Sequence, residues 1–443
     1  MRTTRNSLAL AAALTTLLGS VPATATDDKQ LQDIQRQIQA LKQDYDGKIK
    51  ALEDRLQAAE QASKTAETQA AAAQASVAAV AAAPPAPAAA NAFNPGIAGV
   101  LNGTFGQFSH STANAGIPGF LLAPGTTPGK RGFSLAESEI ALSANIDQAL
   151  YASLIVTLEP DDTVGVEEGY IQSTSLPWGL TLKAGRFYSG IGYLNEKHSH
   201  DWDFIDAPLP YHAMLGDQYG DDGVQVRWLA PTDLYLEFGA EAFRGDAFPA
   251  ANGPNHGKGA GSLFVHTGGD INESSSWLAG LSYLQTDASD RITGGDSFSG
   301  HEHIGIASLV YKWAPQGNPT VHNLILSGEY FRGQNEGSFN GNALSAWQQG
   351  WYVQGVYQFM PRWRVGLRHD QLDSQDLGGA FAGTVLDNLG HTPERNSALL
   401  EFDTSEFGRL RLQYTRDDSN LVSNDELMFA YTVIFGPHGA HRF

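Results

Sequence analysis

The sequence predicts an all-β protein, a 16-stranded antiparallel transmembrane β-barrel preceded by a short N-terminal α-helical coiled coil. Three observations lead to this fold class. First, apolar and polar residues alternate along short segments from residue 93 onward, as in strands with one face toward lipid and one toward a lumen. Second, charged residues are only 17% of the 443 residues, against roughly 25% in an average soluble domain. Third, the connections between the alternating segments are long and short in turn.

The N-terminal segments differ from the rest of the chain. Residues 1–25 are predicted to be a signal peptide, because Arg2 and Arg5 precede an apolar stretch and small residues follow at 23–25. Residues 26–60 predict a periplasmic coiled coil, since apolar residues recur in a heptad pattern. Its seam is formed by Leu31, Ile34, Ile38, Leu41, Tyr45 and Leu52, continued less well by Lys48 and Arg55. One amphipathic helix lying on its own domain is the alternative. Residues 61–92 are predicted to be an Ala/Pro-rich linker, because the prolines of 81–90 stop a helix.

Residues 93–443 are predicted to form the barrel. The alternation is clearest in three segments, 234–243, 363–370 and 409–416. Their apolar faces predict contact with lipid and their polar faces predict the lumen. The apolar sets are Leu234, Leu236, Phe238, Ala240 and Ala242; Trp363, Val365 and Leu367; and Leu410, Leu412 and Tyr414. The opposing sets are Tyr235, Glu237, Gly239 and Glu241; Arg364, Gly366 and Arg368; and Arg409, Arg411 and Gln413.

Sixteen such segments are predicted as strands, and their connections set the topology. Most odd-numbered connections are long, and all even-numbered ones are short, which is the asymmetry of extracellular loops and periplasmic turns. Both chain ends then lie on the periplasmic side. A soluble β-sandwich gives no reason for this regularity. The predicted strands are 96–108, 132–147, 149–159, 164–174, 179–190, 222–230, 234–245, 262–271, 275–287, 302–315, 322–337, 347–361, 363–373, 395–405, 408–418 and 426–436. The predicted long loops are 109–131, 191–221, 246–261, 288–301, 338–346, 374–394 and 419–425.

Several function classes are disfavoured by composition and by missing motifs. The chain has no cysteine, which excludes disulfides, thiolate metal sites and a catalytic thiol. Its net charge of −20 makes it a poor nucleic-acid binder. It contains no nucleophile-elbow GxSxG motif, and the Gly-rich segment 253–261 lacks the phosphate-binding GxxxxGK[ST] pattern. The sequence therefore predicts that the protein is not an enzyme.

With its signal, coiled coil, spacer, sixteen strands and terminal Phe443, the chain resembles a Gram-negative outer-membrane porin. The N-terminal helix with sixteen strands is similar to phosphate-selective porins, which are trimeric. The segment 185–204 and the tail GPHGAH (436–441) resemble zinc-regulated or zinc-associated outer-membrane porins. The tail departs from the family pattern, because family members more often end within the last strand.

The resemblance implies passive diffusion of small hydrophilic solutes across the bacterial outer membrane. It implies a homotrimer, contact with membrane lipid and lipopolysaccharide, and insertion by the barrel-assembly machinery, with the coiled coil in the periplasm. No cofactor is expected beyond a weakly bound zinc or other divalent cation.

The longest predicted connection, 191–221, resembles in position the loop that folds inward in 16-stranded porins. Its apolar residues, among them Trp202, Phe204 and Tyr211, are not needed in a freely solvated loop. Its many carboxylates predict a constriction that prefers cations. The predicted constriction consists of the acidic Glu196, Asp201, Asp203, Asp206, Asp217, Asp221 and Asp222, opposed by luminal Lys183, Arg364, Arg368, Arg409 and Arg411.

Three histidines in the same loop are candidate metal ligands. His198, His200 and His212 lie among carboxylates, and imidazole with carboxylate suits zinc. The spacing of His198 and His200 places both on one side of an extended segment. No strict metal-site spacing is present, so ordinary loop histidines remain the alternative.

Other functions remain open at this stage. Inward-facing Arg364, Arg368, Arg409, Arg411 and Lys183 would suit an anion (phosphate-type) porin. Luminal aromatics would suit a sugar-selective porin, although aromatic girdles at the membrane interfaces use the same residues. A closed structural or adhesive barrel is the remaining alternative.

Overall fold

The computed structural model describes residues 95–111, 116–123, 131–159, 163–252 and 258–436, together with isolated helical positions between 39 and 64. The chain divides into two units, Met1–Ala92 and Phe93–Phe443. In the first unit the described residues, such as Gln39 and Lys64, are helical and exposed. The predicted signal peptide, the linker apart from Lys64, and the apolar seam of the coiled coil lie outside the described residues, as does the tail 437–443.

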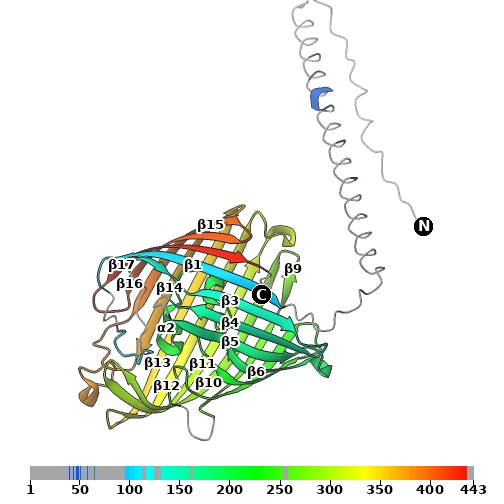
Figure 1. Cartoon of the computed structure of the whole chain (residues 1–443). Helices are drawn as coiled ribbons and strands as arrows, with labels where there is room; N and C mark the ends of the chain where they lie inside the picture. Colours follow the sequence, from blue (N-terminus) through cyan, green and yellow to red (C-terminus); the bar gives the residue numbers. More distant parts are fainter. Residues whose placement is uncertain are drawn as a thin grey trace, which may run out of the picture. The chain divides into compact units, whose positions relative to one another are not determined.

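The second unit is one closed antiparallel sheet (Figure 1). Each strand pairs with its neighbours in sequence, and β1 closes the ring by pairing with β17. The strands are β1 Gly96–Phe108, β2 Gly132–Leu135, β3 Ser138–Asn145, β4 Leu150–Leu158, β5 Val164–Ser173, β6 Leu180–Tyr188, β7 Gly220–Leu229, β8 Tyr235–Phe243, β9 Ala260–Asn272, β10 Ser275–Thr293, β11 Asp296–Trp313, β12 Asn323–Phe339, β13 Asn342–Met360, β14 Trp363–Ser374, β15 Glu394–Ser405, β16 Gly408–Asp418 and β17 Asn424–Phe435.

The seventeen assigned strands make sixteen barrel positions, because β2 and β3 are two parts of one strand. Both pair with β1, Gly103 opposite Leu135 and Val100 opposite Glu139. Only Ala136 and Glu137 interrupt the ladder between them. The predicted sixteen-stranded antiparallel barrel is therefore confirmed.

The two faces of the barrel wall match the predicted alternation. In β14 and β16, Leu367 and Leu412 are exposed on the outer face, whereas Arg368 and Arg411 are buried inside. In β8, Phe238 is exposed and Glu241 is buried. Large exposed apolar side chains cover every sector of the wall, which a water-soluble monomer rarely tolerates and a lipid-facing barrel requires. Among the described residues, no helix combines the length and the apolarity needed to span a bilayer.

Two predicted long loops, 288–301 and 338–346, are wrong. Strands β10 and β11 continue through 288–301 and turn at Gly294 and Gly295, whereas β12 and β13 turn at Asn340 and Gly341. All four turn residues have positive φ, which fits the two-residue hairpin turns in which Asn and Gly are favoured. Strands β10 and β13 therefore reach 19 residues, while β4, β6 and β8 have 9.

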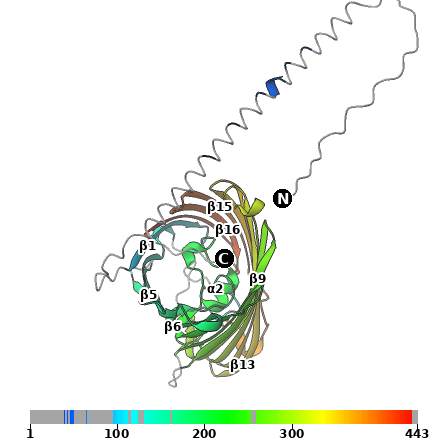
Figure 2. The same ribbon diagram turned by 90° about the vertical axis from the view of Figure 1, so that its right-hand side faces the viewer.

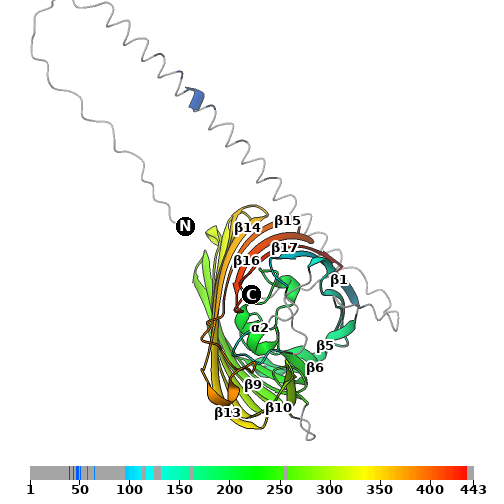
Figure 3. The same ribbon diagram turned by 90° about the vertical axis from the view of Figure 1, so that its left-hand side faces the viewer.

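The interior of the barrel is filled by the segment 189–219, hereafter the inner loop. It carries the one-turn η2 Ser199–Asp201 and the short helix α2 Leu209–Leu215. Views from either side show α2 inside the ring of strands (Figures 2 and 3). The largest apolar cluster in the described chain joins this loop to the wall, with Leu209, Tyr211 and Leu215 packed among Phe187, Phe331 and other inward side chains.

The turn end of the tall hairpins β10–β11 and β12–β13 is covered from inside by further loop segments. Leu121 and Leu386 pack against Phe298, Phe339 and Leu344 in a separate apolar cluster. The Gln348 side chain also donates to the Gly119 carbonyl at 2.7 Å. The remaining short helical turns, η1 Pro177–Gly179, η3 Pro315–Gly317 and η4 Gly379–Phe381, lie in connections.

Candidate functional site

The candidate site is the luminal space between the inner loop and the barrel wall. Helix α2 places the loop because its ends are fixed by sequence: Pro208 precedes it, and Gly216 ends it in the left-handed conformation that glycine adopts without strain. Every helical residue except His212 is buried.

A carboxylate of β12 holds the loop at its helix. Glu329 accepts hydrogen bonds from the hydroxyls of Tyr211 and Tyr352 at 2.8 and 2.7 Å, and from the backbone N–H of Tyr193 at 2.7 Å. Because Glu329 is buried, these donors replace the water that a carboxylate would otherwise bind. The helix end of the loop is thereby fixed to β12 and β13.

Arginines of β14, β15 and β16 hold the central part of the loop. Asp203 lies 2.6 Å from a guanidinium nitrogen of Arg364, and Asp206 lies 2.9 Å from nitrogens of both Arg368 and Arg395. Charge-assisted hydrogen bonds of this type are among the strongest in proteins. The same wall strands also bind the loop backbone.

Arg409 and Arg411 donate to loop carbonyl oxygens. Both reach the Trp202 carbonyl, at 2.9 and 3.0 Å, and Arg411 also reaches that of Phe204 at 3.2 Å. Carbonyl groups in this part of the loop have no strand partner, and these guanidinium groups satisfy them.

The two loop aspartates are tuned by these contacts. Burial favours the neutral form, but the adjacent Arg364 and Arg409 charges hold the pKa of Asp203 below its usual value. For Asp206 the pKa is likewise lowered, because Arg368 and Arg395 outweigh the effect of burial. Both carboxylates are therefore charged at neutral pH.

Carboxylates of β3 and β5 meet the loop histidines on another part of the wall. His200 Nδ1 lies 2.7 Å from Glu139, and His198 Nδ1 lies 3.1 Å from Glu167. The second ring nitrogen of His198 lies 3.4 Å from Glu168. Burial lowers the pKa of His198, but these carboxylates raise it well above its usual value.

Both consecutive glutamates point inward because β5 contains a bulge at this position. The register of β4 and β5 shifts between Ile155 and Val156, so that Glu168 pairs with Ile155 and Val166 with Val156. Glu167 is the extra residue. Bulges redirect side chains in this way and occur often beside functional sites.

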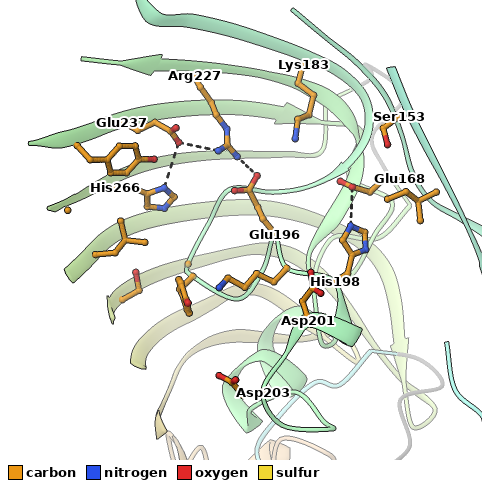
Figure 4. Close-up of a pocket in the computed structure, with 18 of the residues that line it drawn as sticks. Ser153, Glu168, Lys183, Glu196, His198, Asp201, Asp203, Arg227, Glu237 and His266 are labelled. Carbon is orange, nitrogen blue, oxygen red and sulfur yellow. Dashed lines mark hydrogen bonds and ion pairs between the residues drawn. The ribbon is translucent and has the colours of Figure 1, made fainter. Parts of the chain in front are cut away.

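A cavity of about 780 Å³ remains between the inner loop and the wall, where β3–β11 form most of its lining and β1, β14 and β16 the rest. Figure 4 shows Glu196 from the loop, with Arg227 and Glu237 from the wall, in a line of ion pairs on one side. His198 lies on the other side (Figure 4). The charged lining consists of Glu139, Glu168, Glu196, Asp201, Asp203, Glu237 and Asp270, with Lys183, Lys197, Arg227, Arg364 and Arg409.

Lys197 is a basic residue of the inner loop that lines this cavity. Its ammonium group lies 3.8 Å from the centroid of the Tyr193 ring, which is cation–π contact distance. Burial lowers the pKa of Lys197 to about 8. Its charge therefore changes close to physiological pH.

The structure brings together part of the predicted constriction. Six residues of the predicted constriction line the cavity, namely Glu196, Asp201, Asp203, Lys183, Arg364 and Arg409. Asp206, Arg368 and Arg411 instead attach the loop to the wall. Of the predicted bases, Arg364, Arg368, Arg409 and Arg411 contact the loop directly and do not face it across a water gap.

Besides Asp206, Arg368, Arg411 and His200, four predicted residues lie apart from the cavity lining. His212 pairs with Asp217 at 2.7 Å within the loop. Asp221 is buried and accepts the backbone N–H groups of Gly245 and Asp246 at 2.8 Å. Asp222 pairs with Arg186 at 2.8 Å where both side chains are nearly half exposed. Asp222 therefore lies on the outer side of the wall, whereas Asp217 and His212 belong to the inner loop inside the barrel but do not line the cavity.

Sequence reasoning missed the wall residues that complete the site. Glu139, Glu167, Glu168 and Arg227 were not selected, although the pair of adjacent glutamates in VGVEEGY (164–170) interrupts the alternation. That interruption is the signal of the bulge. Arg395 was also missed, because its place beside Asp206 depends on the fold of the inner loop.

Comparisons with known proteins place the chain as follows. No protein-family model matches the sequence. An uncharacterised protein of Aquifex aeolicus (strain VF5) is 31% identical over 350 residues, covering 71% of each protein. Similar solved structures include a loop L8 deletion mutant of OmpT, an outer membrane protein of Vibrio cholerae (TM-score 0.49, 11% identity, 77% of this chain and 99% of that one). They also include an anion-selective porin from Comamonas acidovorans (0.47, 11%, 77% and 99%) and OprB of Pseudomonas putida (0.48, 13%, 77% and 94%). The barrel of this chain is established by its own strand pairing.

Proposed function

We propose that this chain, which belongs to the same family as the Aquifex aeolicus protein, is an outer-membrane porin for passive diffusion of small hydrophilic solutes. The observation that carries the proposal is a closed barrel with an apolar outer face and a charged cavity beside its inner loop. An apolar exterior suits lipid, and a charged interior suits water and ions. The protein then needs no reaction chemistry.

We propose further that the pore prefers cations, among them divalent metals. Seven carboxylate side chains line the cavity against five lysine and arginine side chains and the imidazole of His198, whose pKa the neighbouring carboxylates raise. The excess of negative charge in a low-dielectric enclosure raises the local concentration of cations. Because Lys197 titrates near neutral pH, this excess grows as the pH rises.

An anion-selective pore is the alternative with a structural argument on its side. Arg364, Arg368, Arg395, Arg409 and Arg411 form a row on β14–β16. However, their guanidinium groups bind loop carboxylates and carbonyls. A permeating anion would have to compete with those contacts, so we favour the cation pore. The sugar-selective pore and the closed structural or adhesive barrel remain alternatives that conductance separates.

The assembly belongs to the same proposal. We propose a homotrimer of barrels, each with its own pore, held by a periplasmic coiled coil of residues 26–60. Contact with lipid and lipopolysaccharide, and insertion by the barrel-assembly machinery, follow from a place in the outer membrane.

Reversal potentials in a planar bilayer under a salt gradient test the proposal. We expect cation-selective conductance that falls when Asp201 and Asp270 are changed to Asn, because both line the cavity. Asp222→Asn, on the outer side with Arg186, is the matched control and should leave selectivity unchanged. An anion-selective reversal potential would refute the cation preference. Absence of conductance from folded protein would refute the porin proposal.

A further inference from the structure

The cluster where the inner loop meets β3 and β5 is built like a metal centre. It contains His198 from the loop, Glu139 from β3 and Glu167 from the bulge of β5. One ligand atom from each lies within 4.8 Å of the other two. All three side chains are largely buried, with exposed fractions of 16%, 3% and 5%.

We infer that this cluster binds one divalent transition-metal ion through His198 Nδ1, Glu139 Oε2 and Glu167 Oε2. His198 Nδ1 lies 3.1 Å from the Glu167 oxygen and 3.7 Å from the Glu139 oxygen. Bond lengths of about 2.0–2.1 Å in a tetrahedral site require ligand atoms about 3.3 Å apart. The observed separations lie on both sides of that value. Small side-chain rotations would complete the three protein ligands.

The second oxygen of each carboxylate already has its own partner. Glu139 Oε1 lies 2.7 Å from His200 Nδ1. Glu167 Oε1 accepts the hydroxyl hydrogen of Tyr188 at 2.7 Å. In metal sites such hydrogen bonds orient the ligand oxygens and tune their basicity. The other oxygen of each carboxylate, Oε2, is directed at His198.

The remaining ring nitrogen of His198 is also supported. Its Nε2 lies 3.4 Å from Glu168 Oε2, so the proton carried there can be donated to a carboxylate while Nδ1 binds the metal. The carboxylate–histidine–metal arrangement fixes the tautomer and the orientation of the ring. Glu168 itself is positioned by the backbone N–H of Tyr188 at 3.1 Å.

The open coordination position faces the cavity. Glu139, Glu168 and His198 all line it, so a hydrated ion has an entry path and a water molecule has room to be the fourth ligand. One imidazole with two carboxylates favours zinc-like ions over magnesium, which prefers oxygen ligands alone. The ion would attach the inner loop to β3 and β5, as the arginine contacts attach it to β14–β16. It is a resident ion, because a transported ion must leave readily.

Metal binding to tag-free, full-length protein, folded in detergent and treated with a chelator, tests the inference without requiring conduction. We expect calorimetric titration with Zn²⁺ to show one tight site per chain, absent with Mg²⁺ at the same concentrations. Bound Co²⁺ should give the visible absorption of a four-coordinate site. Glu167→Gln and Glu139→Gln should each weaken Zn²⁺ binding at least 100-fold. Tyr188→Phe, which removes only a supporting hydroxyl, should weaken it about 10- to 100-fold.

His212→Asn is the matched control, because His212 also pairs with a carboxylate of the same loop at 2.7 Å but lies outside the cluster. Its Zn²⁺ affinity should equal that of the parent. Folding of each variant is checked by heat-modifiable electrophoretic mobility. Unchanged Zn²⁺ affinity in folded Glu167→Gln and Glu139→Gln, or equal affinity for Mg²⁺, would overturn the inference. Conductance failing while the site binds Zn²⁺ would refute the porin proposal alone.

Discussion

Asp206 is the carboxylate whose loss should free the inner loop. Its Oδ1 accepts hydrogen bonds from Arg368 and Gln413, and its Oδ2 accepts one from Arg395. In Asp206→Asn the negative charge disappears, and one carboxylate oxygen is replaced by an NH₂ group. That group is a hydrogen-bond donor and cannot accept a hydrogen bond from an arginine. The side chain then loses either its bond from Arg395 of β15 or its bonds from Arg368 of β14 and Gln413 of β16, while the Asp206 carbonyl oxygen keeps its bond from Arg368 at 2.8 Å.

The free energy lost in this variant depends on the carboxylate partners that Arg368 and Arg395 keep. Breaking a buried ion pair costs about 3–5 kcal/mol when the remaining charge has no partner. Here Arg368 keeps Asp370 at 3.0 Å and Arg395 keeps Asp417 at 2.9 Å. We therefore expect the lower end, about 3 kcal/mol, which raises the equilibrium constant for loop release on the order of 100-fold.

Amide hydrogen exchange of the inner loop measures this quantity directly, since exchange reports local opening. Loop amides should exchange on the order of 100-fold faster in Asp206→Asn, while amides of β10 and β13 stay protected. Single-channel currents should become noisier. Asp222→Asn breaks a comparable pair on the exposed outer side, worth less than about 1 kcal/mol, and serves as control. Loop exchange within threefold of the parent, in a folded barrel, would refute the reasoning.

Three further changes have defined outcomes. Raising the pH from 7 to 9 should increase cation selectivity, because Lys197, with a pKa of about 8, loses its positive charge; reversal potentials of Lys197→Gln should show no such change. Lowering the pH should leave the inner loop bound until about pH 4, near the unperturbed carboxyl pKa. Asp203 and Asp206 have lowered pKa values, so the stabilisation that they contribute is lost only as they protonate. Hydrogen exchange of the loop that is already fast at pH 6 would contradict this. Gly185→Ala should lower the temperature at which the folded barrel unfolds in a gel-shift assay. Gly185 has φ +133° and an added Cβ would lie 2.2 Å from the Gly169 carbonyl oxygen, which corresponds to a strain of about 1–3 kcal/mol. An unchanged unfolding temperature would argue against this strain.

The strand pattern could be predicted because each strand has an apolar outer face and a polar inner face. In β16 the predicted and observed bounds, 408–418, coincide, since Arg409, Arg411 and Gln413 alternate with apolar residues without interruption. The hairpin ends at 288–301 and 338–346 could not be predicted in the same way. Beyond the membrane both faces of a strand are polar or variable, so the alternation that identifies a strand disappears there. The Asn340–Gly341 pair was the local signal of a turn.

The site was predictable only in part, because its partners come from distant strands. The acidic character of the inner loop was visible in the sequence. The pairing of Asp206 with Arg395, 189 residues apart, depends on where the loop lies inside the barrel. The arginines were expected to face the loop carboxylates across water, and burial instead drew them into contact. Glu167 reaches His198 only through a one-residue bulge, which shifts the side-chain alternation locally.

The unequal strand lengths give the channel a slanted entrance. At about 3.3 Å per residue and a tilt near 40°, a 9-residue strand such as β4 rises about 23 Å, close to the roughly 25 Å apolar band of such barrels. The 19-residue β10 rises about 48 Å by the same rule. In the proposed membrane setting, one flank of the rim would end at the lipid headgroups, while the other would stand about 25 Å higher. Loop segments lean on the high flank, as Ala251 does against Ala288. In the outer-membrane pore that we propose, a solute diffusing along the cell surface would therefore meet the opening from the low flank, and large molecules approaching from above would meet the high flank first.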